Sequence, residues 1–117
     1  MQEQFKNLKV WQKAMELVKQ VYQMTRTFPK DEQYGLTSQM RRAAVSVPLN
    51  IAEGKGRYHK KEYIQFLYMA RGSLYETMTL IELAQELKYL AKPEEEVLLE
   101  RCSEITAMTN GLIQAIQ

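Results

Sequence analysis

Apolar side chains recur at alternating spacings of three and four residues along most of this 117-residue chain. That spacing places them on one face of an α-helix, because a helix turns once every ~3.6 residues. The pattern covers four segments, about 8–26, 36–55, 60–90 and 93–116, which are joined by short connections. The sequence therefore predicts an all-α protein, an antiparallel up-and-down four-helix bundle in which residues 1–117 form a single domain.

The first segment carries two neighbouring apolar stripes, so its apolar arc is wider than contact with one other helix requires. One stripe consists of Leu8, Trp11, Met15, Val18, Tyr22 and Thr25, and the other of Val10, Ala14, Leu17, Val21 and Met24. Each later segment has one principal stripe, which we expect to face the core: Leu36, Met40, Ala44, Val47 and Ile51; Leu67, Ala70, Leu74, Thr77, Ile81 and Ala84; and Leu98, Cys102, Ile105, Met108, Leu112 and Ile116.

Proline and glycine mark where the helices are expected to bend, end or approach one another. Pro48 lies in the middle of the second segment, where it removes a backbone donor and crowds the preceding turn. We therefore expect this helix to be kinked near Pro48 or broken there into two short helices. Gly54 and Gly56 should end it, with a glycine available for a left-handed cap. The Gly72-Ser73 pair should let a neighbouring helix approach closely.

The charges are unevenly distributed, although the net charge of the chain is only +2. Residues 38–75 contain seven Lys or Arg against two Asp or Glu, a net charge of +5. Residues 76–117 contain three against eight, a net charge of −5. A basic middle beside an acidic tail indicates a dipolar particle with one face suited to polyanions.

No constellation of residues predicts catalysis or metal binding. His59 is the only histidine, and no acid, serine or thiol lies at a helical spacing from it that would suggest a proton relay. The Glu94-Glu95-Glu96 run suits the positive end of a helix better than a metal. The lone Cys102 falls on an apolar stripe, which favours a buried free thiol. We expect a non-enzymatic protein with no cofactor and no metal.

The N-terminal stretch MQEQFKNLKVWQK is polar and mixed in charge, which is not the pattern of a secretory signal. No stretch of the sequence approaches the ~20 apolar residues of a membrane span. We therefore expect a cytoplasmic bacterial protein that makes no membrane contact.

Three features of the central stretch suit a binding surface. Gly54-Lys55-Gly56-Arg57 is not a true phosphate loop, which lies between a strand and a helix, but its amides could meet a phosphate at a basic helix corner. One arc of the second segment holds Arg42, Ser46, Asn50, Glu53 and Arg57, as in a hydrogen-bonded helix interface or a ligand groove. One arc of the third holds Lys60, Lys61, Ile64, Tyr68, Arg71 and Tyr75. Cations interleaved with tyrosines suit RNA, and they equally suit a subunit contact.

The segment RRAAVSVPLNIAEGKGR, followed by FLYMARGSLYE, resembles the signature of a four-helix-bundle family named for proteins encoded in 23S ribosomal RNA intervening sequences. The accessory variability determinant proteins of diversity-generating retroelements belong to the same group. The resemblance extends from FKNLKVWQKA through the last helix. At position 59 the family often has a Ser or Thr able to cap the third helix, where this chain has His59. The matching positions are Arg41, Arg42, Asn50, Glu53, Gly54, Gly56, Arg57, Arg71, Gly72, Ser73 and Glu76.

The resemblance implies a bundle that assembles into a ring of five subunits with a positively charged surface. It also implies nucleic-acid binding and, for the retroelement members, partnership with a reverse transcriptase. We therefore expect a homopentamer that binds RNA or DNA. The alternative is a protein-interaction scaffold without a nucleic-acid role, in which the wide apolar arcs and the Arg/Tyr stripe serve subunit and partner contacts. The predicted binding residues are Arg41, Arg42, Lys55, Arg57, Lys60, Lys61 and Arg71.

Overall fold

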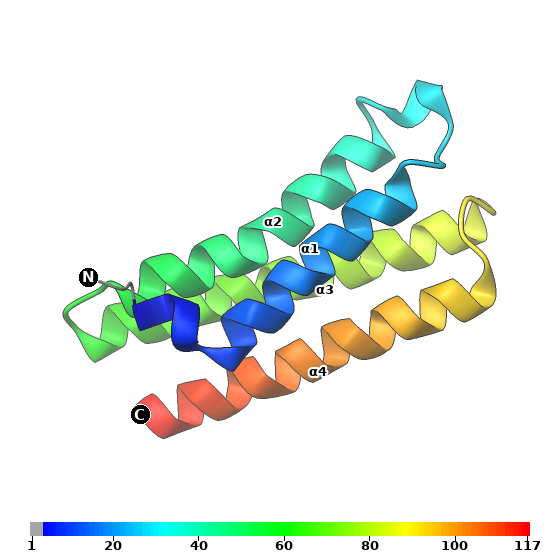
Figure 1. The fold of residues 1–117 in the computed structure, drawn as a ribbon. Coiled ribbons are helices and arrows are strands. Elements are labelled where there is room, and N and C mark those ends of the chain that lie inside the picture. Colours follow the sequence, from blue (N-terminus) through cyan, green and yellow to red (C-terminus); the bar gives the residue numbers. More distant parts are fainter. Residues whose placement is uncertain (1–3) are drawn as a thin grey trace.

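The computed structural model describes residues 4–117, and its helices run along one long axis of 43 Å (Figure 1). Helix α1 (Lys9–Thr25) follows a short 3-10 helix, η1 (Gln4–Asn7). A second 3-10 helix, η2 (Lys30–Glu32), lies in the connection to α2 (Leu36–Lys55), after which come α3 (Lys60–Glu86) and α4 (Lys92–Ile116). No strand occurs in this range, and the predicted all-α four-helix bundle is confirmed.

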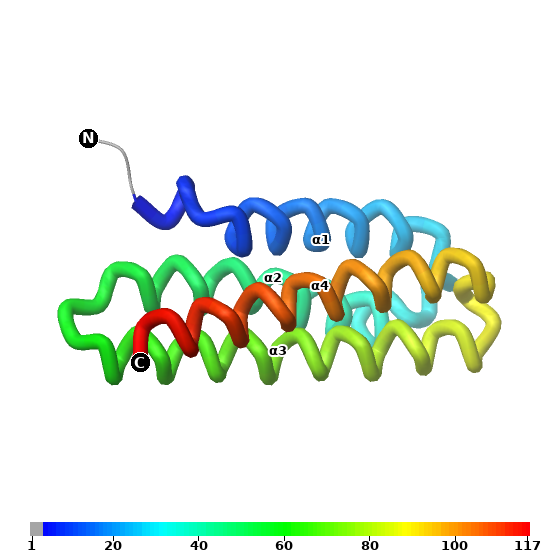
Figure 2. The backbone as a smooth tube through the Cα atoms, turned by 90° about the horizontal axis from the view of Figure 1, so that it is seen from below, coloured from blue at the N-terminus to red at the C-terminus, as the bar shows by residue number. Residues whose placement is uncertain are grey.

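Each helix packs against the helices before and after it in the chain, and α4 closes the bundle against α1. The contact between α2 and α3 is the most extensive, and that between α1 and α4 the least. Figure 2 shows α1 and α3 on opposite sides of the bundle, with α2 and α4 between them. Figure 1 places the α2–α3 connection, the start of α1 and the end of α4 at one end of the molecule.

The core comes from the stripes that the sequence predicts, and the structure decides between the two stripes of α1. Val10, Ala14, Leu17 and Val21 are buried, and Met24 at the end of their stripe is half-buried. The neighbouring stripe of α1 is half-buried from Leu8 to Val18, exposed at Tyr22 and buried only at Thr25. The principal stripes of α2 and α3 are buried throughout, as expected. In α4 the stripe is buried from Leu98 to Ile105 and becomes half-buried after that.

Helix α2 runs without interruption from Leu36 to Lys55, with the buried Pro48 inside it. The alternative of two short helices in series is therefore wrong, and a bend at Pro48 remains a prediction. Because proline has no N–H, the helix loses one hydrogen bond at this point. Burial of the proline ring among apolar side chains provides a compensating gain.

Helix α3 ends at Glu86, four residues before the predicted end. Lys88 adopts the left-handed conformation, with φ of 65°, and the Tyr89 amide donates to the Ala84 carbonyl over 2.9 Å. This is a Schellman-type ending, for which glycine is the usual signal in a sequence. Here a lysine occupies the left-handed position, so the sequence contains no glycine that would signal the end of the helix. The apolar spacing through Leu90 therefore suggested a longer helix.

The glycines have roles different from those predicted. No described glycine has a positive φ, and Gly56 ends α2 with φ of −80°, so the expected left-handed cap is wrong. Gly54 lies inside α2, where an added Cβ would come within 2.7 Å of the Phe66 Cβ and 3.1 Å of the Tyr63 Cδ1. The close helix approach therefore occurs at Gly54. At Gly72, where the sequence suggested it, nothing lies within 4 Å of an added Cβ.

The connections at the other end of the bundle are joined through Glu32. The Leu36 amide donates to one of its carboxylate oxygens over 3.1 Å, and the Tyr89 hydroxyl donates to the other over 3.0 Å. The hydrogen bond to Glu32 and burial raise the pKa of Tyr89. The rings of Phe28 and Tyr89 pack with centroids 5.5 Å apart. One carboxylate thus fixes the start of α2 and the α3–α4 connection together.

The first stability test compares two glycines in helix interiors. Replacing Gly54→Ala should lower the free energy of unfolding by about 1–3 kcal/mol, because the new methyl group overpacks the α2–α3 contact. Gly72→Ala should raise it by about 0.5–1 kcal/mol, because alanine favours the helix and the site is open. Urea denaturation followed by circular dichroism measures both changes. Equal effects of the two substitutions would contradict the assignment of Gly54.

The second test concerns Cys102, which is buried and whose thiol pKa is raised by burial to about 12. The native protein should resist alkylation by iodoacetamide at pH 8.5, and the urea-unfolded protein should be modified, as mass spectrometry can measure. An unfolded cysteine loses its proton near pH ~8.5. The contribution of this thiol to stability should therefore be complete below that pH and should decline as the pH rises toward 12. Rapid labelling of the folded protein would contradict this burial.

Candidate nucleic-acid interface

The seven predicted cations lie at three separate places on the bundle. Lys55, Arg57, Lys60 and Lys61 surround the α2–α3 connection. Arg41 and Arg42 lie in the second turn of α2, about 20 Å away from Lys55 along a helix that rises ~1.5 Å per residue. Arg71 lies near the middle of α3. The structure brings four of the seven together at one end and leaves the other three apart.

Arg41 and Arg71 join neighbouring helices. The Arg41 Nε donates to Thr25 Oγ1 over 2.8 Å and its Nη2 to the Tyr22 carbonyl over 3.3 Å, while its guanidinium lies 4.5 Å from the centroid of the Tyr22 ring. The Arg71 Nη1 donates to Asn110 Oδ1 of α4 over 2.9 Å. Both side chains are half-buried. Their charges therefore serve contacts within the bundle, and neighbouring Arg42 remains exposed.

The two polar arcs of the sequence also divide between packing and surface. Ser46 hydrogen-bonds to Ser73 of α3, and the Asn50 amide donates to the Ser46 carbonyl over 2.8 Å, so this part of the α2 arc is a helix interface. On the α3 arc, the Arg71 guanidinium lies 4.8 Å from the centroid of the Tyr68 ring. Tyr68 and Tyr75 are each about half exposed, at 40% and 51%.

We call six residues at the α2–α3 connection the basic tip. They are the four cations Lys55, Arg57, Lys60 and Lys61, together with Tyr58 and His59 between them. The Arg57 guanidinium lies 4.6 Å from the centroid of the Phe66 ring, and the Lys55 ammonium lies 5.7 Å from that of Tyr63. Within residues 4–117 the ion pairs are Lys13–Glu104 and Lys92–Glu95, neither of which involves the tip. Two of the four tip cations, Lys55 and Arg57, thus contact aromatic rings, which orient a cation without neutralising it.

The start of α3 carries charges of the sign that weakens a helix. Lys60 and Lys61 occupy its first two positions, and the His59 side chain makes no capping hydrogen bond. The N-terminal amides of a helix already carry a partial positive charge, so cations there are unfavourable. Glu62 in the same turn offsets part of this charge, whereas the first turn of α4 has two acids, Glu94 and Glu95, against Lys92. The two lysines therefore do not stabilise the start of α3.

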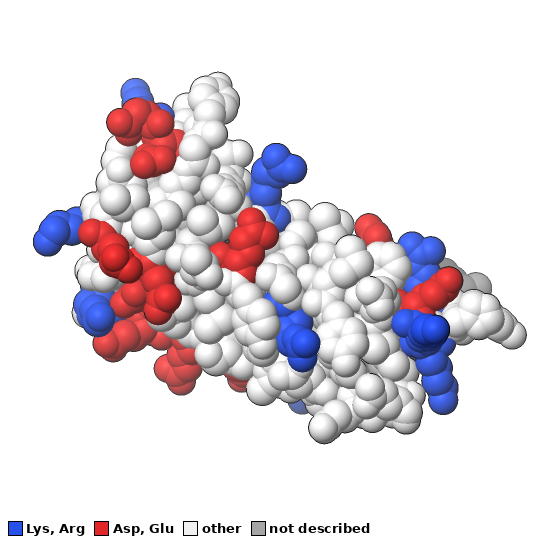
Figure 3. All heavy atoms as spheres, turned by 180° about the vertical axis from the view of Figure 1, so that it is seen from behind, with Lys and Arg blue, Asp and Glu red and all other residues white. Residues whose placement is uncertain are grey.

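One face of the molecule shows a weaker form of this polarity. In Figure 3, Asp and Glu predominate toward one end, where some Lys and Arg also lie, and Lys and Arg predominate at the other end. Two carboxylates, Glu53 and Glu62, also lie in the helical turns next to the tip. The tip is thus the end at which a polyanion would meet the most favourable field.

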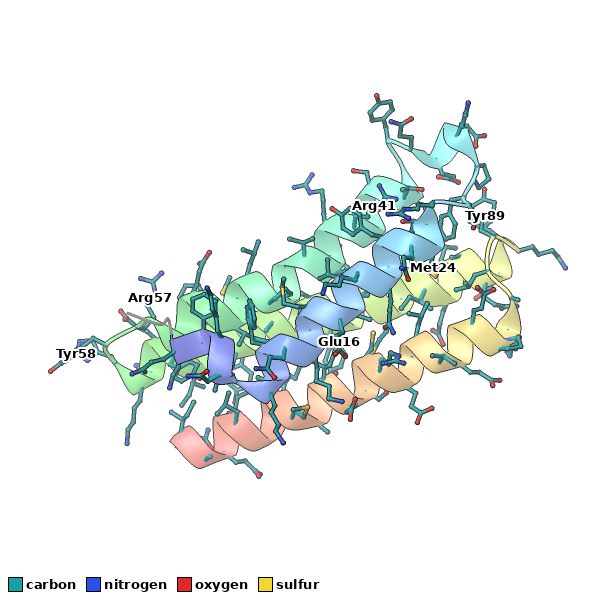
Figure 4. The ribbon with its side chains drawn as sticks, in the orientation of Figure 1. Glu16, Met24, Arg41, Arg57, Tyr58 and Tyr89 are labelled. Atoms are coloured by element: carbon teal, nitrogen blue, oxygen red, sulfur yellow. The ribbon has the colours of Figure 1, made fainter. Side chains whose placement is uncertain are left out.

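Tyr58 is the part of this site that sequence reasoning missed. Its side chain is 94% exposed and points away from the end of the bundle, as Figure 4 shows beside Arg57. Tyr68 and Tyr75 were predicted from their helical spacing. An aromatic residue inside a connection has no such spacing. The available signal was its position within Gly-Arg-Tyr-His-Lys-Lys.

Residues 4–117 contain neither a cluster suited to a metal ion nor a helix suited to crossing a membrane. No group of three or more His, Cys, Asp or Glu side chains in this range is arranged to hold a metal ion. None of the described helices combines the length and apolar character needed to cross a membrane.

The neighbouring arginines of α2 allow a direct test of the assignment of Arg41. Arg41→Ala should lower the free energy of unfolding by about 1–2 kcal/mol, since it removes two hydrogen bonds and a cation–π contact. Arg42→Ala should change it by less than about 0.5 kcal/mol, because its side chain is exposed. Urea denaturation measures both values. An Arg41→Ala variant as stable as the wild type would show that these contacts contribute nothing.

Comparison with solved structures shows the same fold in a relative of low sequence identity. The bundle is similar to the crystal structure of a protein of unknown function from the S23 ribosomal protein family of Bacteroides thetaiotaomicron, with a TM-score of 0.80. The two sequences are 20% identical, and the match covers 89% of this chain and 97% of the other. No match was found among curated proteins.

The family comparison covers nearly the whole bundle. The family model described as 23S rRNA-intervening sequence protein matches residues 6–111, which include the four helices except for the last residues of α4. This range also contains every residue of the basic tip. The chain therefore belongs to the 23S rRNA-intervening sequence protein family.

Proposed function

We propose that this protein is a non-enzymatic homo-oligomer that binds RNA or DNA through its basic tip. The observation that carries the proposal is the group of four cations at the α2–α3 connection, none of which pairs with a carboxylate within residues 4–117. Two of them rest on the rings of Phe66 and Tyr63. A cation held in this way keeps its N–H donors available for phosphate oxygens.

The expected binding is electrostatic. Lys and Arg that neutralise phosphates release the counterions condensed on the nucleic acid, so affinity falls as the salt concentration rises. The first-turn amides of α3, which no side chain caps, favour an anion as well. The name of the family, which refers to 23S ribosomal RNA, supports RNA as the first target to test.

We further propose that the subunits form a ring, for which the family resemblance suggests five copies. A ring needs two different surfaces, because each subunit contacts its neighbours head to tail. One candidate is an apolar groove between α1 and α2, lined by Phe5, Trp11, Met15, Val18, Val45, Pro48, Leu49 and Ala52. The other is the set of exposed apolar side chains along α3: Tyr68, Met69, Tyr75, Leu83 and Leu87.

These apolar surfaces also favour a second candidate function, a protein-interaction scaffold. In that case the groove and the α3 side chains would receive other proteins, and the tip charges would play no part in binding. A reverse transcriptase is a proposed partner by resemblance to the retroelement members of the group. The two candidates differ in what the tip does, so charge reversal at the tip distinguishes them.

The test replaces Arg57, Lys60 and Lys61 together by Glu. Because each lost phosphate contact removes about one unit from the slope of log K against log salt, the slope should fall by roughly one to three. Affinity for a mixed RNA pool at low salt should fall at least about tenfold, measured by fluorescence anisotropy. The matched control reverses the exposed cations Lys19, Arg26 and Lys30, which changes the net charge equally away from the tip.

The control variant should retain the wild-type salt slope if binding is local to the tip. Equal losses in both variants would mean that only the net charge matters. Light scattering on the same samples reports the assembly. An oligomer that is lost in the tip variant, with RNA binding absent in the wild type, would favour the scaffold.

A further inference from the structure

We infer that the basic tip selects unpaired nucleotides, with Tyr58 stacking on a base while the neighbouring cations hold the flanking phosphates. This inference rests on the proposed function and adds the class of nucleic acid that the site takes. It starts from the ring of Tyr58, which is 94% exposed at the end of the bundle (Figure 4). Its aromatic neighbour among the described residues is His59, at 5.0 Å between centroids and at right angles.

A T-shaped contact of this kind occupies at most one face of the Tyr58 ring, and no other aromatic pair in residues 4–117 involves Tyr58. At least one face of the ring is therefore free of other rings. A free aromatic face accepts a base by stacking, and a base offers its face only where it is not enclosed in a paired helix. The orientation of the ring therefore suits an unpaired nucleotide.

Exposure alone does not carry the inference, since single exposed aromatic residues are common. Tyr34 is exposed to nearly the same extent, at 91%. The two tyrosines differ in their surroundings. Tyr58 lies between Arg57 and the two lysines that begin α3. Tyr34 follows the acidic Asp31 and Glu32 of η2 and lines a pocket with the exposed Arg42, so it lies at a site of mixed charge.

The arginine beside Tyr58 is also oriented before any ligand arrives. The Arg57 guanidinium lies against the Phe66 ring at 4.6 Å, and the adjacent first-turn amides of α3 are not capped by a side chain. Free strands are bound in this manner, with a positive surface for the backbone and a ring for the base. A duplex would meet the same cations and gain nothing from the ring except at its ends. Tyr58 should therefore contribute far more to single-strand affinity than to duplex affinity.

The experiment uses the full chain and two labelled probes: an unstructured 20-nucleotide RNA of mixed sequence and its blunt-ended duplex with the complementary strand. At a fixed low salt concentration, Tyr58→Ala should weaken binding of the single strand about 5- to 150-fold, the range for loss of one stacked base. Binding of the duplex should stay within about twofold. Tyr58→Phe should keep the wild-type values, because it keeps the ring. Tyr34→Ala is the matched control and should change neither.

The outcomes separate this inference from the proposed function. A wild-type protein that binds neither probe at low salt overturns both. A wild-type protein that binds both probes, with Tyr58→Ala unchanged or equally weakened on both, overturns the stacking role alone. An effect of Tyr34→Ala as large as that of Tyr58→Ala would also overturn it, because the position of the ring would then not matter. Circular dichroism of each variant confirms that it is folded.

Discussion

The close approach of α2 and α3 at Gly54 determines where the basic tip lies. The absence of a side chain at this position lets the last turns of α2 rest on Tyr63 and Phe66 of α3. The same two rings then receive Lys55 and Arg57, which follow Gly54 directly in the chain. One steric condition thus closes the helix corner and provides the aromatic surfaces that orient the cations. A larger residue at position 54 would displace Phe66 and, with it, the guanidinium of Arg57.

The two ends of the bundle are stabilised in opposite ways. At the far end, the Glu32 carboxylate accepts hydrogen bonds from the Leu36 amide and the Tyr89 hydroxyl, and acidic residues follow the start of α4. The hydrogen bonds satisfy the Leu36 and Tyr89 donors, and the acidic residues are attracted to the partial positive charge at the start of α4. At the basic tip, two lysines begin α3, and Lys55 and Arg57 contact rings in place of carboxylates. This arrangement leaves positive charge uncompensated, which lowers stability slightly and raises the attraction for an anion.

Most of the fold follows from the spacing of apolar residues, because a helix must bury one face. The spacing predicted the helices and most of the core, and it also predicted α2 at its observed bounds. It could not decide which stripe of α1 faces inward, since that depends on how α2 and α4 flank α1. It also misplaced the end of α3, where Lys88 adopts a conformation that the sequence does not signal. The role of Gly54 required knowledge of which residues of α3 lie opposite.

The binding residues were less predictable than the core, because charge alone does not distinguish a free cation from one that joins helices. Arg41 and Arg42 are adjacent in the sequence, yet only Arg41 faces Thr25 and Tyr22 of α1. Arg71 shares an arc with two tyrosines, and it proves to bond to Asn110. Both assignments depend on contacts between helices far apart in the chain. Tyr58 was not predicted as a binding residue, because an aromatic residue in a short connection has no periodicity to reveal it.

Cyclic assembly would change the electrostatics of the tip without any new contact there. The apolar groove between α1 and α2 and the exposed side chains of α3 lie along the flanks of the bundle, whereas Tyr58 projects beyond its end (Figure 4). In a ring with cyclic symmetry, equivalent points of all subunits lie at the same height along the axis. Every tip would therefore lie on one rim, and the acidic ends would lie away from it. A chain with a net charge of only +2 would then present a concentrated cationic surface, because the separation of charge along each bundle would add up around the ring.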